Sequence, residues 1–163
     1  MSIEIITATA DDVDRLRALR LAALKDTPDA FGARYEDEVN KPITEWQNRL
    51  KNTSWCFVVA DGVDVGLLAV DRAEKDRNSD CWLSSWWIHQ DHRGSGIPKL
   101  MLTWLEQLCV ENNWKKIGLG VWQENIRAIT AYKKLGFTQG KALLPSRSIP
   151  GLMYLPMYKN VGE

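Results

Sequence analysis

One segment constrains the fold of this chain more than any other: an apolar strand, a glycine loop and an amphipathic helix follow one another between residues 81 and 112. Residues 81–88 carry apolar side chains on both faces of an extended pattern, which is typical of a central strand. From residue 97 onward, apolar residues recur three and four positions apart, which predicts a helix that ends near residue 111. The chain therefore contains a strand–loop–helix unit whose strand lies inside a sheet.

The loop that joins this strand to the helix has the composition of an anion-binding site. Residues 92–99 read HRGSGIPK. Glycines let a backbone approach a phosphate closely, unpaired amides at a helix start favour negative charge, and Arg93 and Lys99 add cationic side chains. A tight turn that uses glycine only for its geometry is the alternative. Nicotinamide and ATP sites are disfavoured, because the third glycine of GxGxxG and the GK[ST] ending of a Walker loop are both missing.

The other segments alternate between strands and helices. We expect strands at residues 3–6, 55–60, 63–70, 117–122, 137 onward and 153–159, and helices at 9–27, 44–51 and 125–135. The dipeptide Asp61-Gly62 is favoured in two-residue turns and predicts a hairpin between the second and third strands. Antiparallel strands come first and strand–helix units second, which predicts one mixed α/β domain over residues 1–163.

Composition narrows the range of partners. The 21 basic residues balance the 21 acidic ones, so the basic excess of a nucleic-acid-binding protein is missing. Apolar runs such as residues 66–70 are far shorter than the roughly 20 residues that cross a bilayer. No secretory signal is visible at the N-terminus, and Cys56, Cys81 and Cys109 are expected to be reduced core thiols. We therefore expect a cytoplasmic protein that binds neither nucleic acid nor a membrane.

Two motifs resemble the GCN5-related N-acetyltransferase (GNAT) family. The family's acyl-CoA loop has the pattern [RQ]-x-x-G-x-[GA], and residues 93–98 read RGSGIP, with Pro98 in place of the last glycine or alanine. Proline is tolerated in a first helical turn, because its missing N–H has no intrahelical partner there. Residues 125–137, NIRAITAYKKLGF, match the family segment N-x-x-A-x-x-x-Y-x-x-x-G-F at every marked position. The resemblance extends over nearly the whole chain.

The resemblance implies a fold, a co-substrate and a reaction. The fold would be α/β (mixed α+β), a single domain whose mostly antiparallel sheet is flanked by helices and splayed between its fourth and fifth strands. Acetyl-CoA would bind in the splay and give its acetyl group directly to a primary amine of a small molecule or a peptide, without a metal. A protein lysine or N-terminal acetyltransferase and a non-catalytic acyl-CoA-binding module are alternatives. A homodimer is compatible with each of these functions.

The resemblance also assigns site residues. Tyr132 is the expected catalytic residue, because it matches a tyrosine near the CoA sulfur, where a phenol can protonate the departing thiolate. The expected acyl-CoA-binding residues are Trp86, Trp87, Ile88, Arg93, Gly94, Ser95, Gly96, Ile97, Lys99 and Asn125. The three strand residues would act through their backbone, with the tryptophan side chains in the core. Asn125 would bind the pantetheine arm, cap its helix, or do both.

The sequence does not identify a general base. Many relatives use a carboxylate on the fourth strand, but the positions expected to point inward are Trp82, Ser84 and Trp86. Substitutes elsewhere are Glu36, Asp80, His89 and Glu124, and a water chain to bulk solvent is the alternative.

Three further sequence features give weaker indications of function. The acidic residues 36–38 lie where the resemblance places the acceptor-site lip and would attract cationic amines, unless they form only a solvated charged run. A covalent acyl-Cys81 intermediate is the weaker alternative, because no residue clearly supports this cysteine as a nucleophile. His89 and His92 have the spacing HxxH but no third ligand, so no metal site is expected.

Overall fold

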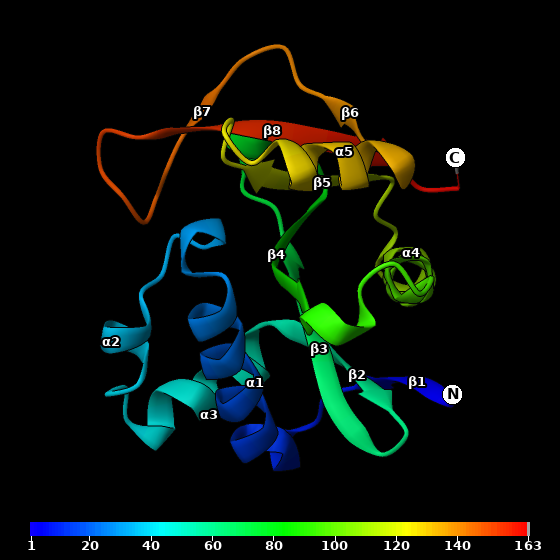
Figure 1. Ribbon diagram of the computed structural model, residues 1–163. Helices are drawn as coiled ribbons and strands as arrows, with labels where there is room; N and C mark the ends of the chain where they lie inside the picture. The colour runs from blue at the N-terminus through cyan, green and yellow to red at the C-terminus, as the bar shows by residue number, and fades with distance from the viewer. Residues whose placement is uncertain (163) are drawn as a thin grey trace.

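A twisted sheet runs through the whole molecule (Figure 1). The computed structural model describes residues 1–162, and in this part of the chain the strand order is β1-β2-β3-β4-β5-β8-β6, with β7 paired to β8. The strands are β1 Ile3–Thr7, β2 Ser54–Ala60, β3 Val63–Arg72, β4 Cys81–Ile88, β5 Lys116–Val121, β6 Thr138–Gln139, β7 Leu144–Pro145 and β8 Met153–Asn160. Neighbouring strands are antiparallel except β4 and β5, which are parallel. The predicted mixed, mostly antiparallel sheet is confirmed.

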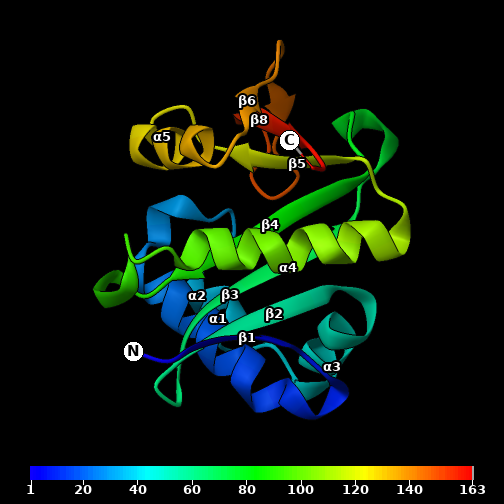
Figure 2. The same cartoon turned by 90° about the vertical axis from the view of Figure 1, so that its right-hand side faces the viewer.

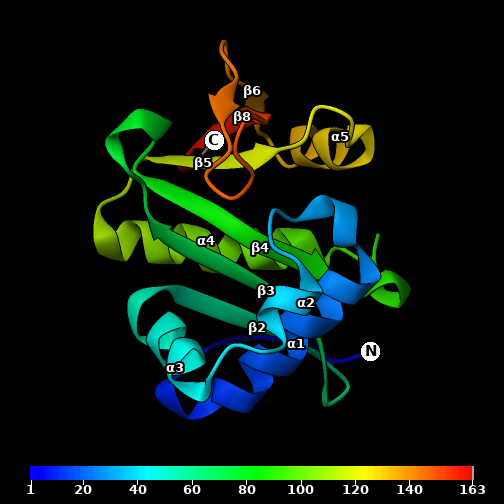
Figure 3. The ribbon, with the colours of Figure 1, turned by 90° about the vertical axis from the view of Figure 1, so that its left-hand side faces the viewer.

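Helices cover both faces of the sheet. They are α1 Val13–Asp26, α2 Tyr35–Glu38, α3 Ile43–Asn52, α4 Ile97–Asn112 and α5 Ile126–Lys134. The long α4 crosses one face (Figure 2), whereas α1, α2 and α3 gather on the other (Figure 3). The first helix begins later than predicted, because residues 10–12 form a 3₁₀ turn that the side chain of Thr9 caps.

Each face of the sheet has its own hydrophobic cluster. The cluster on the α4 face includes Ile97, Met101, Leu105, Ile129 and Phe137. The cluster on the α1 face includes Leu16, Leu19, Trp46, Phe57 and Trp87. Side chains alternate between the faces of a strand, so Cys56 and Val58 of β2 join the first cluster while Phe57 joins the second. This explains why the central strands are apolar at nearly every position.

Three local predictions can be compared with the structure. The hairpin is confirmed: Asp61 and Gly62 have φ angles of 48° and 83°, the positive values that a two-residue type I′ turn needs. Residues 29–40 lie outside the predicted strands and helices, yet they contain α2, whose single turn directs Glu38 toward arginines of α1 and α3. The strand expected from residue 137 onward is only Thr138–Gln139, because the chain then leaves the sheet as a loop.

The predicted splay between the fourth and fifth strands is confirmed. β4 and β5 pair only at three positions, from Cys81–Ile117 to Leu83–Leu119, and then diverge. β4 also bulges against β3, since Ser84 lies opposite Ala69 whereas Trp87 lies opposite Leu67. Within this bulge, Ser85 adopts a left-handed φ of 54°, which is uncommon for a residue other than glycine.

The three cysteines are buried and free, as expected for core thiols. The sulfur atoms of Cys81 and Cys109 lie 3.8 Å apart, and burial raises the pKa of the Cys56 thiol to about 12. Separately, none of the helices within residues 1–162 has the length and apolar character needed to cross a membrane.

Candidate active site

Two adjoining cavities occupy the splay between β4 and β5. The first, which we name the loop-side cavity, measures about 200 Å³ and is lined by the end of β4 together with Arg93, Asn125 and Tyr132. The second, the arginine-lined cavity, measures about 390 Å³ and is lined by residues of α1, β3, β4, β5 and the loop before β8. Both cavities are lined by Ala30, Phe31, Leu83, Ser84, Ser85, Gly120 and Val121. They therefore meet where the two strands separate.

The glycine loop presents unpaired amides at the start of α4. Gly94 and Gly96 have φ angles of 79° and 81°, and a Cβ added to either would meet no atom within 4 Å. Within the described chain, no hydrogen bond is formed by the amides of residues 94–97. The hydroxyl of Ser95 donates to the carbonyl of His92. Residues 94–96 are exposed whereas Ile97 is fully buried, so the amides of residues 94–96 are the ones that a ligand can reach, and the expected role of Ile97 in binding is not supported. Open space and unpaired N–H groups fit an anion.

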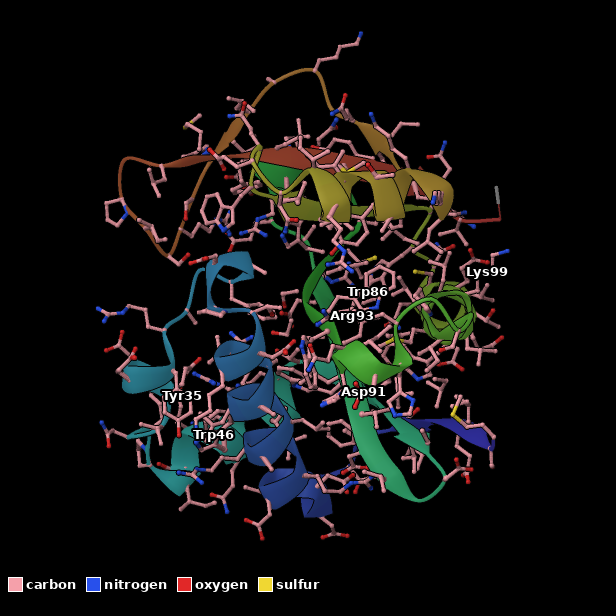
Figure 4. The ribbon with its side chains drawn as sticks, viewed as in Figure 1. Tyr35, Trp46, Trp86, Asp91, Arg93 and Lys99 are labelled. Carbon is pink, nitrogen blue, oxygen red and sulfur yellow. The ribbon has the colours of Figure 1, made fainter. Side chains whose placement is uncertain are left out.

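Arg93 lines the loop-side cavity, but its guanidinium bonds within the protein. Its Nε donates to the carbonyl oxygen of Ile88 at 2.9 Å, and a terminal nitrogen lies 2.6 Å from Oδ2 of Asp26. Figure 4 shows Arg93 near Trp86, between β4 and the loop. The arginine that the motif assigns to phosphate binding therefore links the loop to α1 and β4.

The consecutive tryptophans Trp86 and Trp87 of β4 point to opposite faces of the sheet. Trp87 is buried in the α1-face cluster and donates from Nε1 to Asp26 at 2.9 Å. Trp86 packs on the α4-face cluster, where its Nε1 lies 3.3 Å from the sulfur of Met101. The expected core position holds for Trp87, whereas Trp86 is only partly buried and also lines the loop-side cavity. The expectation that Trp82 and Trp86 share one face is wrong. Trp82 lines the arginine-lined cavity and Trp86 does not, because the bulge at Ser85 reverses the alternation.

Tyr132 of α5 and Asn125, the N-cap residue of this helix, both line the loop-side cavity. The Tyr132 ring lies between two aromatic rings, with centroid distances of 5.6 Å to Trp86 and 6.0 Å to Phe137. Burial raises the pKa of its phenol to about 12, so the hydroxyl keeps its proton throughout the physiological range. Asn125 caps the helix by accepting from the amide of Ala128 at 3.2 Å, while it still lines the cavity.

Lys99 lies apart from the other predicted ligands. It lines a hollow of about 250 Å³ that also includes Lys134 of α5. Figure 4 places it at the outer side of α4, away from Trp86 and Arg93. The structure therefore brings the loop, the end of β4, Asn125 and Tyr132 together and leaves Lys99 outside this group.

The arginine-lined cavity contains charged groups that sequence reasoning missed. Arg20, Arg77 and Arg147 line it, together with one carboxylate, that of Asp71. Burial raises the pKa of Asp71, whereas a hydrogen bond from Thr53 and the charge of Arg77 lower it. Asp71 lies directly opposite Trp82 in the strand register. No local pattern could have revealed this position, because it depends on how β3 and β4 pair.

The carboxylates and the histidine that the sequence suggested as general bases lie outside both cavities. Asp80 accepts from the amides of Lys115 and Lys116 at 2.7 and 2.9 Å, where β5 begins. Nδ1 of His89 accepts from the amide of Asp91. Neither of these residues, nor Glu36 or Glu124, lines the loop-side cavity or the arginine-lined cavity.

The acidic run 36–38 does not form a common surface. Glu38 is 5% exposed and binds Arg49 through both carboxylate oxygens, at 3.2 and 2.8 Å, while Arg20 lies 3.8 Å away. The predicted acidic lip is therefore wrong for Glu38, because this carboxylate neutralises arginines inside the protein. Glu36 and Asp37 are exposed, and neither lines the two cavities. In the described chain, no group of three His, Cys, Asp or Glu side chains could hold a metal ion.

Comparison with known proteins identifies the family. Residues 17–137 match the family model described as the acetyltransferase (GNAT) family, so the chain belongs to this family and the predicted membership is confirmed. The spermine/spermidine N(1)-acetyltransferase of Bacillus subtilis (strain 168) is 35% identical over 65 residues. This match covers 39% of the chain and only 43% of that relative.

Solved structures share the fold over nearly the full chain. A GNAT-family acetyltransferase from Streptococcus pneumoniae has a TM-score of 0.76 at 18% identity and covers 99% of this chain and 100% of its own. The acetyltransferase yncA from Salmonella typhimurium, solved with acetyl-CoA, has a TM-score of 0.72 at 20% identity, with coverages of 100% and 96%. At these identities the likeness establishes the fold.

Proposed function

We propose that the protein is an acetyl-CoA-dependent N-acetyltransferase that transfers the acetyl group directly to a primary amine. The observation that carries this proposal is the pair of cavities meeting in the splay, one of them lined by Arg93, directly before the exposed and unpaired amides of residues 94–96. Family membership supports the reaction class, and the acetyl-CoA held by the Salmonella relative supports the donor. The polyamine named for the Bacillus relative is one class of acceptor to test.

The loop and β4 would hold the donor. The exposed amides of residues 94–96 would bind the pyrophosphate, and the helix dipole of α4 would add to that attraction. The pantetheine arm would occupy the loop-side cavity, where β4 residues beyond Leu83 have no partner on β5. The arm could therefore pair with the strand in place of β5, which would aim the thioester toward the junction of the cavities.

Two side chains would then move the protons. The amine nitrogen attacks the thioester carbonyl carbon, a C–N bond forms, and the C–S bond breaks. Asp71, the one carboxylate lining either cavity in the described chain, would accept the proton lost by the amine, directly or through water. Tyr132 would donate its phenolic proton to the departing thiolate and recover a proton from solvent.

The acceptor would be a small molecule or a peptide amine. We expect the protein to act in the cytoplasm, in keeping with its three free cysteines. We expect its reaction to involve neither nucleic acid nor a membrane surface. The oligomeric state, a homodimer among the alternatives, can be measured by light scattering on the purified chain.

Two measurements test this function together. Calorimetry measures acetyl-CoA binding, and a thiol-release assay follows CoA production with a panel of diamines, amino acids and lysine-containing peptides. We expect binding, and release that depends on an amine. Gly96→Asp should weaken acetyl-CoA binding at least tenfold, because its carboxylate would repel the pyrophosphate. Gly62→Asp is the matched control, because Gly62 has a similar φ of 83° and open space around it but lies in the β2–β3 turn.

Two outcomes would contradict the proposal. Acetyl-CoA binding without thiol release from any amine would favour a non-catalytic acyl-CoA-binding module. An unchanged affinity in Gly96→Asp would mean that the pyrophosphate binds away from the glycine loop.

A further inference from the structure

The charges of the arginine-lined cavity define a feature of the acceptor beyond its amine. We propose that the acceptor also carries an anionic group, a carboxylate or a phosphate, and that Arg77 and Arg20 bind this group. The inference deepens the proposed function, since it names the class of amine that the same site would take.

The three arginines of this cavity differ in how far the protein satisfies them. Arg147 is paired, with contacts of 2.6 Å to Glu74 and 2.5 Å to Asp76. Arg77 has no carboxylate within 4.0 Å among the described residues, and its buried Nε has no hydrogen-bond partner. An unpaired buried donor is unfavourable, so Arg77 has unused capacity for an anion.

Arg20 is also incompletely paired. Its nearest carboxylate, Glu38, is 3.8 Å away and already bonds twice to Arg49. One terminal nitrogen of Arg20 is buried without a partner. Burial lowers its pKa to about 10, which leaves the guanidinium charged at neutral pH. Two cations with unsatisfied N–H groups therefore line one cavity.

Aromatic rings fix the positions of both guanidinium groups. The central carbon of Arg77 lies 4.3 Å from the ring centroid of Trp82, and that of Arg20 lies 5.1 Å from the centroid of Phe31. Tyr154 packs against Trp82 with a centroid distance of 6.0 Å. Stacking uses the face of a guanidinium and leaves its edge N–H groups for a planar anion. The rings also offer an apolar surface to the body of the acceptor.

Asp71 adds a negative charge to the cavity that Arg20 and Arg77 line. It faces the same cavity and can attract the amine end of the acceptor, while the arginines attract its anionic end. A polyamine offers no anion, and its extra ammonium groups would be repelled by Arg20 and Arg77. The lining therefore favours an aminocarboxylate or an amino phosphate over a polyamine.

Matched acceptors test the inference. We would measure kcat/KM by thiol release for phenylalanine, phenylalaninamide, phenethylamine, phosphoethanolamine and spermidine, at saturating acetyl-CoA. We expect at least one anionic amine to exceed phenethylamine and spermidine by about tenfold or more, since a bond to a charged group is worth about a factor of ten to a hundred. Comparing phenylalanine with phosphoethanolamine distinguishes the two kinds of anion. Equal or better use of spermidine would overturn the inference while leaving the proposed function intact.

Arginine variants separate recognition from structure. Arg77→Gln should raise KM for the anionic amine about tenfold or more and leave KM for acetyl-CoA unchanged. Arg72→Gln is the matched control, because Arg72 also lies over a tryptophan, Trp114, at 5.8 Å but does not line the cavity. An equal loss for anionic and neutral amines in Arg77→Gln would contradict the assignment.

Measuring the binding of anionic amines tests the anion site even if the protein turns over no amine. If no amine releases thiol, the proposed function fails, and calorimetry with phenylalanine and phosphoethanolamine still tests the anion site. Binding that is lost in Arg77→Gln and kept in Arg72→Gln would then support the site. No binding of either anionic amine to the wild-type protein would overturn it.

Discussion

Asp26, the last residue of α1, is 2.6 Å from the guanidinium of Arg93, the residue before Gly94 in the glycine loop. The same carboxylate oxygen accepts from Nε1 of Trp87 at 2.9 Å. Three elements are joined at one oxygen atom: α1, the end of β4 and the loop. The hydrogen bond from Trp87, followed by that from Arg93, lowers the pKa of Asp26 below its ordinary value.

Asp26→Asn should loosen the glycine loop. We expect the KM for acetyl-CoA to rise about threefold, since a partly exposed ion pair is worth up to about 1 kcal/mol, while the KM for the amine stays unchanged. Steady-state kinetics measures both. Asp14→Asn, an exposed position on the same helix, is the control. An unchanged KM for acetyl-CoA would mean that the ion pair does not position the loop.

Tyr132→Phe should slow acetyl transfer and leave acetyl-CoA affinity intact. The ring and its stacking on Trp86 remain, but the proton donor is lost, which is typically worth about a hundredfold to ten-thousandfold in rate. Single-turnover measurements at saturating acetyl-CoA avoid masking by slow product release. With a phenol pKa of about 12, the wild type should show no alkaline loss from Tyr132 below about pH 10. A wild-type single-turnover rate in the variant would assign the proton to solvent.

Asp71→Asn should remove the base and change the pH profile. Burial raises the pKa of Asp71, so the carboxylate is protonated at a higher pH than an ordinary aspartate, and activity should fall as pH decreases through that raised value. The variant should lose about a hundredfold or more in kcat and should lack this acidic limb. A profile of kcat against pH tests this, with Asp61→Asn in the remote β2–β3 turn as the control. A wild-type profile in Asp71→Asn would exclude the carboxylate as the base.

Glu38→Gln should destabilise the fold, whereas Glu36→Gln should not. Glu38 is buried between Arg20 and Arg49, and removing one partner of a buried ion pair is destabilising by about 3–5 kcal/mol. Glu36 is exposed, and an ion pair at such a position contributes at most about 1 kcal/mol. Urea denaturation compares the two free energies of unfolding. Equal stabilities would show that Arg20 and Arg49 do not depend on Glu38.

The sequence predicted the features that depend on local pattern. The glycine loop, the hairpin turn and the Asn125 cap are each encoded within a few neighbouring residues, and each appears as expected. Features that join distant segments could not be predicted. Arg93 and Asp26 are 67 positions apart, and the partner of Asp71 depends on the register of two strands. Glu38 looked like part of a solvated run, because its charge partners lie on two other helices.

Side chains of β4 alternate between the two faces of the sheet, and the bulge shifts this alternation by one residue. The bulge decides which of the two consecutive tryptophans faces each half of the molecule: Trp86 stacks on Tyr132, and Trp87 bonds to Asp26. In an unbulged strand of the same length, regular alternation from Ser84 onward would send each tryptophan to the other face, even though every side chain kept its chemistry. The left-handed backbone of Ser85 therefore decides which side chains reach each cavity, and a β-branched residue there, which disfavours a positive φ, should alter the site without changing any of its functional groups.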